Sequence, residues 1–381
     1  MTMPEPPPDA AESSRELAAL IVDEIERAGG WIPFARYMEL ALYAPGLGYY
    51  SGGARKFGAA GDFVTASELS PLFAEALAAQ LEPVLAASAP RVLEAGAGSG
   101  ALALGLLREL ERRGALPERY EILELSGELR ARQQETLAAA PQLAARVGWL
   151  DALPEQFSGA VVANELLDAL PVNIVAWRED GIFERGVALA DGGFAWRERP
   201  AEGALLAVSQ GLTFVQPPYV SEIALAARAW IAEWGRILRH GALLLIDYGF
   251  PQREYYHPQR AEGTLMCHYR HHAHGDPFWL PGLNDLTAHV DFTAAAEAGH
   301  DAGLEVLGYA SQAQFLLNCG LARLLEARQA DGAAAYAALA SGVQKLISPA
   351  EMGELFKVLA LGKEIGKPLA GFARGDRLHA L

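Results

Sequence analysis

A glycine-rich turn between an apolar strand and a helix constrains the fold of this chain more than any other feature. Residues 91–100 read Arg-Val-Leu-Glu-Ala-Gly-Ala-Gly-Ser-Gly, and a helical pattern over 101–112 follows directly. Glycines let the backbone turn tightly and approach a ligand closely. The N-terminus of the following helix presents free N–H groups and the positive end of its dipole. The pattern therefore predicts a strand–turn–helix unit that holds a ligand.

Two ligand classes use such a turn, and the acidic residues around it favour one of them. Gly96, Gly98 and Ala101 satisfy the relaxed dinucleotide pattern, so a NAD(P)-dependent oxidoreductase stays open. Glu94 ends the strand, where it suits an ammonium group better than a pyrophosphate. Glu124 ends the next expected strand, where it can accept hydrogen bonds from two ribose hydroxyls. These acids favour S-adenosylmethionine (SAM), with its contacts at Glu94, Gly96, Gly98, Gly100 and Glu124.

Strand and helix patterns alternate from residue 91 onward, which predicts an α/β fold with a parallel sheet and right-handed crossovers. Strands are expected at 91–95, 119–124, 146–150, 159–163, 242–247, 304–309 and 356–361. The last two would form an antiparallel hairpin. Seven strands in this arrangement are the Rossmann-like sheet of class I SAM-dependent methyltransferases.

Composition divides the chain into a core and several additions. We expect a disordered tail (1–14), an N-terminal helical segment with a lid loop (15–90), a methyltransferase core (91–172, 221–250 and 291–381), and insertions that form a substrate subdomain (173–220 and 250–290). Turn signals at Asp180-Gly181 and Asp191-Gly192-Gly193 predict a β-meander in the first insertion.

The lid is expected over residues 43–70, a long stretch rich in glycine and aromatic residues. Long loops without secondary structure are often functional. Its glycines would permit motion, and its aromatic side chains would exclude water after closure. We therefore expect Gly61, Asp62 and Thr65 to lie near SAM.

A second group of polar residues follows the fourth expected strand, in the run Asn164-Glu-Leu-Leu-Asp-Ala-Leu-Pro171. Ligands of open α/β sheets bind beyond the C-terminal ends of the strands, so Asn164 is expected beside SAM. Glu165 and Asp168 are three residues apart and would share a face of a helical turn. Paired carboxylates suit a guanidinium group, which binds carboxylates through a planar fork of donors. These two are the expected catalytic residues, whereas Asp151, after the third strand, is expected near the adenine amino group.

Charge and cysteine content restrict the partners. The chain has 381 residues and a net charge of −16, which disfavours nucleic acid as a partner. Cys267 and Cys319 lie far apart in no metal-binding pattern, as in proteins of a reducing compartment. Neither a signal peptide nor an apolar run of about 18 residues is recognisable. We expect a cytoplasmic protein without a membrane partner, monomeric or homodimeric. The histidines between His268 and His274 lack a ligand pattern, so no metal is expected.

Several motifs together resemble the MidA-like family of SAM-dependent methyltransferases. The matching stretches cover 37–50, 61–71, 94–100, 164–171, 245–249, 285–292 and 352–360. The glycine turn is generic, whereas its combination with Gly61-Asp-Phe and the 164–171 run is specific. The family includes the mitochondrial arginine methyltransferase that assists assembly of respiratory complex I. The resemblance implies a class I fold, SAM as methyl donor, and arginine of a protein as acceptor, with a complex I subunit or its bacterial counterpart as a candidate. Glu165 or Asp168 would then handle the guanidinium.

Two other classes stay open at this point. One is the NAD(P)-dependent oxidoreductase on a Rossmann-like sheet. The other is an assembly factor that binds SAM without catalysis. Binding of SAM against NAD would separate the first alternative from a methyltransferase, and transfer of a labelled methyl group would separate the second.

Overall fold

The computed structural model describes residues 3–52, 65–366 and 368–381. The chain divides into two compact units. The core unit comprises Val64–Leu167, Trp230–Pro251 and Phe292–Leu381, and the insertion unit comprises Met1–Phe63, Asp168–Ala229 and Gln252–Asp291. Each unit is therefore assembled from segments that are distant in the sequence.

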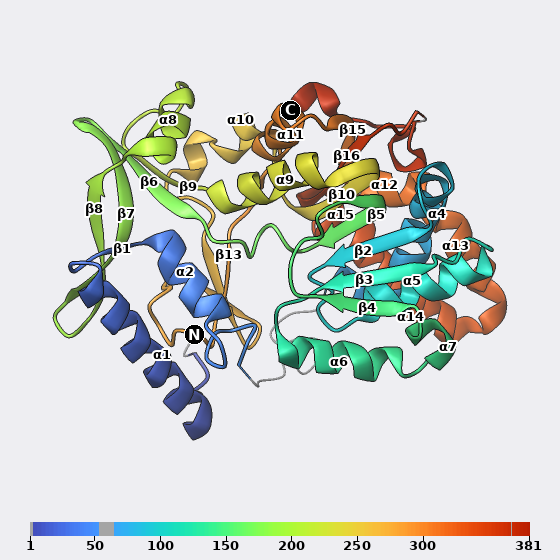
Figure 1. The fold of residues 1–381 in the computed structure, drawn as a ribbon, viewed down its shortest axis with the longest axis horizontal. Coiled ribbons are helices and arrows are strands. Elements are labelled where there is room, and N and C mark those ends of the chain that lie inside the picture. The colour runs from blue at the N-terminus through green and yellow to red at the C-terminus, as the bar shows by residue number, and fades with distance from the viewer. Residues whose placement is uncertain (1–2, 53–64, 367) are drawn as a thin grey trace. The chain divides into compact units, whose positions relative to one another are not determined.

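The core unit contains the predicted sheet. Its strands are β2 (Arg91–Ala95), β3 (Arg119–Leu123), β4 (Val147–Leu150), β5 (Phe157–Asn164), β10 (Leu238–Phe250), β15 (Glu305–Ser311) and β16 (Phe356–Lys363). They lie in the order β15-β16-β10-β5-β2-β3-β4, and β16 runs antiparallel to both of its neighbours while the other pairs are parallel. Figure 1 shows β5, β2, β3 and β4 side by side. This arrangement confirms the class I architecture expected from the sequence.

The helices of the core unit alternate with these strands. They are α3 (Ala66–Leu69), α4 (Pro71–Ala87), α5 (Ala101–Arg112), α6 (Gly127–Leu137), α7 (Pro141–Ala144), α11 (Phe292–Asp301), α12 (Gln312–Asn318), α13 (Leu321–Glu326), α14 (Ala333–Ile347) and α15 (Met352–Leu355), with α9 (Leu225–Ile237) leading into β10. Gly320 and Gly332 precede α13 and α14 with φ of 91° and 98°. These left-handed residues interrupt the alanine-rich stretch, so it forms separate helices.

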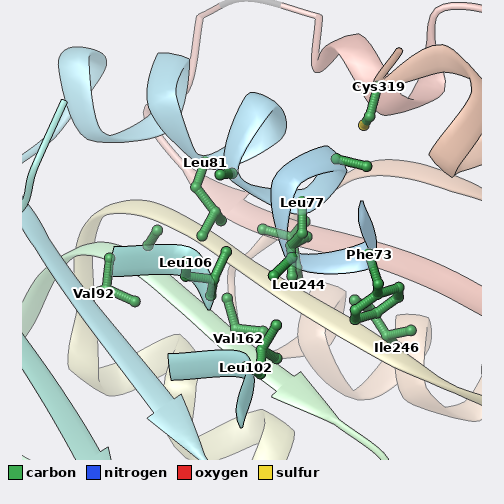
Figure 2. Close-up of a cluster of buried hydrophobic side chains, with 14 of the residues drawn as sticks. Phe73, Leu77, Leu81, Val92, Leu102, Leu106, Val162, Leu244, Ile246 and Cys319 are labelled. Atoms are coloured by element: carbon green, nitrogen blue, oxygen red, sulfur yellow. The ribbon is translucent and has the colours of Figure 1, made fainter. Parts of the chain in front are cut away.

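Apolar side chains of α4 and α5 cover one face of this sheet. Figure 2 shows Leu77 and Leu81 of α4 beside Leu106 of α5, together with Val162 and Leu244 from the strands. All five are fully buried, and each such burial contributes about 1.5–3 kcal/mol. Helix α4 thus belongs to the core unit, whereas the sequence placed it in an N-terminal segment that ended at residue 90.

The insertion unit joins the N-terminal segment to both insertions. Its elements are α1 (Pro8–Arg27), β1 (Ile32–Pro33), α2 (Phe34–Tyr43), β6 (Asn173–Arg178), β7 (Gly181–Ala190), β8 (Gly193–Pro200), α8 (Gly203–Gly211), β9 (Tyr219–Ile223), α10 (Gln252–Tyr255), β11 (Met266–Tyr269), β12 (His272–His274), β13 (Asp285–Thr287) and β14 (Val290–Asp291). The predicted meander is present as β6, β7 and β8, and β1 pairs with β7. A second small sheet has the order β12-β11-β13.

The expected disordered tail over 1–14 is wrong beyond its first residues. Helix α1 begins at Pro8, because proline is well suited to the first position of a helix. Leu17, Ile21 and Ile25 are fully buried in the insertion unit's apolar cluster. Proline and acidic composition indicated disorder, but the apolar stripe that follows extends the helix back through these residues.

Candidate functional site

The glycine turn after β2 has a backbone that only glycine adopts readily. Gly96, Gly98 and Gly100 have φ of 71°, 51° and 80°, all in the left-handed region. A Cβ at Gly96 would lie 2.9 Å from Cδ1 of Leu166, and one at Gly100 would lie 3.1 Å from Cα of Gln133. The turn is therefore a close-packed backbone cradle at the start of α5.

Glu94, at the end of β2, is a buried carboxyl group, and no cationic side chain of the described residues binds it. The hydroxyl of Tyr120 donates a 2.6 Å hydrogen bond to its Oε2. Burial raises the pKa of Glu94 to about 7, the Tyr120 hydrogen bond opposes that shift, and the charge of Glu124 adds to it. A bound cation would favour the charged form of Glu94, as the sequence expectation of an ammonium partner requires.

Glu124 follows β3 and is held in place by its neighbours. Its carboxylate accepts hydrogen bonds from the backbone N–H of Ser126 (2.9 Å) and from Nε2 of Gln133 (3.1 Å). Burial raises its pKa, and these two bonds partly offset the shift. Gln133 also donates to the carbonyl of Gly98 (3.1 Å) and accepts from Trp149 (2.8 Å), so one amide links both strand ends. Sequence reasoning missed Gln133, because a glutamine within a polar helix gives no signal.

Asp151 is the most exposed of those predicted cofactor residues that the structure describes. Its side chain is 86% exposed and pairs with Arg130 at 2.6 Å. Arg130 also donates to the carbonyl of Leu150 (2.9 Å), which fixes this rim. Leu125, directly after Glu124, is 76% exposed. An exposed leucine beside a carboxylate is suited to pack against the face of an aromatic base. The position of Leu125 directly after the strand-end acid Glu124 could have marked it as a site residue in the sequence.

The chain turns sharply after β5, and here a prediction is wrong. Glu165 has φ of 54°, although its N–H still bonds the carbonyl of Ile246 at 2.9 Å. Residues 165–171 form bends and turns rather than a helix. The N–H of Leu167 instead donates to Oδ2 of Asp247 (2.8 Å). Glu165 and Asp168 therefore do not share the face of a helical turn, because left-handed backbone at Glu165 prevents the helix from starting.

The carboxylate of Glu165 binds the beginning of α3. Its Oε1 accepts hydrogen bonds from the N–H of Ala66 (3.2 Å) and from Nδ2 of Asn164 (3.0 Å). Thr65, partly buried, precedes this contact, and its hydroxyl lies 3.0 Å from that of Ser67. The structure thus joins Asn164 and Glu165 to Ala66, the residue that follows Thr65.

The remaining lid residues of the prediction, Gly61 and Asp62, lie outside the described residues. The described parts of the expected lid are divided, since residues 44–52 belong to the insertion unit and 65–70 to the core unit. Closure of the lid over SAM stays a prediction.

Asp168 lies in the insertion unit among aromatic and acidic side chains. Its carbonyl accepts a hydrogen bond from the N–H of Ala288 (3.0 Å). Tyr50 donates to Oδ1 of Asp285 (2.8 Å) and stacks on Tyr43 with ring centroids 5.5 Å apart. Burial raises the pKa of Tyr50, and the charges of Asp285 and Asp168 raise it further. Asp285 was missed as a site residue, although it begins one of the motifs that resemble the MidA-like family.

Metal-binding clusters and membrane-spanning helices are absent from the described part of the chain. There, no group of three or more His, Cys, Asp and Glu side chains could hold a metal ion. Nε2 of His274 lies 2.9 Å from Oδ1 of Asn284. No described helix combines the length and apolar character needed to cross a bilayer.

Comparison with known proteins identifies the family. Residues 72–310 match the model of a family of S-adenosyl-L-methionine-dependent methyltransferases. The chain belongs to this family. The oxidoreductase reading is not favoured, and SAM is the methyl donor of the enzyme.

Named relatives match along most of their length. The protein arginine methyltransferase NDUFAF7 of Danio rerio is 30% identical over 372 residues, covering 88% of this chain and 84% of that protein. The Caenorhabditis elegans homologue is 28% identical, covering 81% and 78%. A methyl transferase structure from Burkholderia thailandensis, bound to S-adenosyl-homocysteine, is 55% identical, covers 100% of both chains and has a TM-score of 0.96.

The residues of the strand ends fit SAM. An added Cβ would crowd the Leu166 side chain at Gly96 and Gln133 at Gly100. Two buried acids, Glu94 and Glu124, end adjacent strands. Oδ1 of Asn164 is buried without a protein partner among the described residues. A cationic, donor-rich ligand suits this acidic surface. The cradle and the acids therefore fit SAM, whose methyl group is the electrophile that the enzyme transfers.

Proposed function

We propose that this chain methylates an arginine side chain of a protein. The observation that carries the proposal is the match to relatives named protein arginine methyltransferases, which spans 88% of this chain and 84% of the Danio rerio protein. The resemblance to the MidA-like family, which includes a methyltransferase of complex I assembly, favours a complex I subunit or its bacterial counterpart as the acceptor. The net charge of −16 suits a basic protein segment as partner.

Within the core unit, the acids and the glycine turn would each contact a different part of SAM. Glu124 is held by Ser126 and Gln133 so that its carboxylate can accept the ribose hydroxyls. Glu94 and the turn would receive the methionine end, which carries the ammonium group. Leu125 and Asp151 would contact the adenine.

Glu165 is the residue we assign to the acceptor. Arginine is a poor nucleophile because its lone pair is delocalised and its pKa exceeds about 12. A carboxylate that binds one edge of the guanidinium orients a nitrogen toward the methyl carbon. As the N–C bond forms, the S–CH3 bond of SAM breaks and S-adenosylhomocysteine leaves. The nitrogen must also lose a proton, which Glu165 can accept. The Ala66 and Asn164 hydrogen bonds fix the carboxylate for this task.

Asp168 stays a second catalytic candidate. Its three-residue spacing from Glu165 no longer supports it, since that argument required a helix. Its support is now the acidic and aromatic neighbourhood within the insertion unit, where Tyr43 and Tyr50 stack. Aromatic faces and carboxylates together attract guanidinium groups.

Methyl transfer into a depleted proteome tests this function. The protein would be incubated with methyl-labelled SAM and an extract from cells that lack it, and labelled proteins would be identified by mass spectrometry. The expected result is label on an arginine side chain. Label on another side chain would contradict the arginine proposal, and SAM binding without any transfer would favour the non-catalytic assembly factor.

A further inference from the structure

The short helix α3 contacts the glycine turn through an acidic side chain that the sequence did not indicate. The hydroxyl of Ser99 donates a 2.9 Å hydrogen bond to Oε1 of Glu68. Ser99 lies between Gly98 and Gly100, and its carbonyl accepts a 2.7 Å bond from Thr136. Glu68 is therefore fixed against the part of the chain that holds the methionine end of SAM.

The other end of α3 is attached to the end of β5. The N–H of Ala66 donates to Glu165, which also binds Asn164. Strands β2 and β5 are neighbours, with Ala95 paired to Ala163. The short helix α3 thus connects the glycine-rich segment to Glu165, the residue that we assign to the methyl acceptor.

Two buried oxygen atoms in this region have no hydrogen-bond partner within the described residues. They are Oε2 of Glu68 and Oδ1 of Asn164. An unsatisfied buried acceptor destabilises the folded protein, and more so when it is charged. Since Ser99 occupies only one oxygen of Glu68, the other has a free position for a donor that the ligand would bring.

We propose that Glu68 binds the ammonium group of SAM and so makes α3 a cofactor-recognition element. The ribose hydroxyls are assigned to Glu124, whereas the ammonium brings a charge and three N–H donors, enough to contact Glu68 as well as Glu94. A carboxylate fixed on the glycine turn is complementary to it. The inference rests on SAM binding and is independent of which acceptor is methylated.

The variant Glu68→Gln tests this role, because glutamine keeps the size of the side chain and an acceptor for Ser99 but removes the charge. Calorimetry would compare SAM with 5′-methylthioadenosine, which lacks the ammonium and carboxylate groups. We expect SAM to bind at least about tenfold more weakly, as for a lost charge-assisted bond. The affinity for 5′-methylthioadenosine should stay within about twofold.

Two further variants make the outcome decisive. Glu82→Gln, which removes a carboxylate paired with Arg113 at 2.9 Å, is the matched control and should leave both affinities unchanged. Ser99→Ala keeps the charge but loosens Glu68, so it should weaken SAM less, with the same preference between ligands. Unchanged SAM affinity in Glu68→Gln would overturn the proposal. Equal weakening of both ligands would overturn it too, since that indicates a structural role for α3.

Discussion

The ends of two neighbouring strands, β2 and β5, present different kinds of surface. After β2, the chain offers backbone in left-handed conformations at Gly96, Gly98 and Gly100. After β5, it offers side chains, with the Glu165 carboxylate bound to Ala66 and Asn164. The β2 end is suited to hold a ligand closely. The β5 end is suited to exchange a proton with one.

This difference predicts different sensitivities to mutation. Adding a Cβ after β2 changes shape and should affect binding of SAM. Changing carboxylate to amide after β5 preserves shape and should affect turnover. Substitutions at the two ends can therefore separate the two functions.

The largest effect on SAM affinity is expected for Gly98→Val. A β-branched residue is strained at φ of 51° and obstructs the approach of the backbone to the ligand. We expect SAM affinity to fall by more than about 100-fold, equivalent to roughly 2.7 kcal/mol. Titration calorimetry would measure it.

Gly114→Val is the matched control for that variant. Gly114 follows α5 with φ of 71°, and nothing lies within 4 Å of its Cβ position. It therefore reproduces the backbone strain without touching the cradle, and SAM affinity should be retained. Wild-type affinity in Gly98→Val would place SAM elsewhere.

A smaller effect is expected from pH, through Glu94. Burial raises the pKa of this carboxyl to about 7 in the free protein. Cationic SAM favours the ionised form, so affinity should rise as pH rises through 7. Between pH 5.5 and 6.5 we expect roughly eightfold tighter binding, in a range more than about one unit below the pKa of an α-amino group such as that of SAM.

The Glu94→Gln variant supplies the control, because glutamine does not titrate. Its affinity should be weaker and flat across the same pH range. A wild-type affinity that is independent of pH would show that Glu94 does not face the ligand's charge.

The smallest effect is expected for Asp151→Asn. The carboxylate is 86% exposed and pairs with Arg130, so water competes for any bond to the adenine. We expect SAM to bind about threefold more weakly, as for an exposed polar contact. Unchanged affinity would remove Asp151 from the contacts, and a loss above about tenfold would show that the rim closes around it.

The sheet could be predicted from sequence because its buried strands are continuous apolar runs separated by helical patterns. The glycine turn and the strand-end acids could also be predicted, because they lie in the sequence directly beside those apolar runs. The division into units was not, since it depends on pairs such as Ile32 with Val187, which are distant in the chain.

The conformation of the chain after β5 also could not be predicted from the sequence. Residues 165–171 have helix-compatible composition, but the bonds of Leu167 to Asp247 and of Glu165 to Ile246 select a turn. Glu68 and Gln133 depend on contacts with the glycine turn from other helices. Periodicity carries no information on such contacts.

The measurement that tests the account most directly is made on Glu165→Gln. SAM affinity and the single-turnover rate of methyl transfer to the labelled acceptor would be measured on the same preparation. Loss of a positioned proton acceptor should lower the rate by roughly 10²–10⁴, while SAM affinity stays within about threefold. Unchanged methyl transfer would contradict the role of Glu165. Lost SAM binding in a folded variant would contradict the separation of the two strand ends.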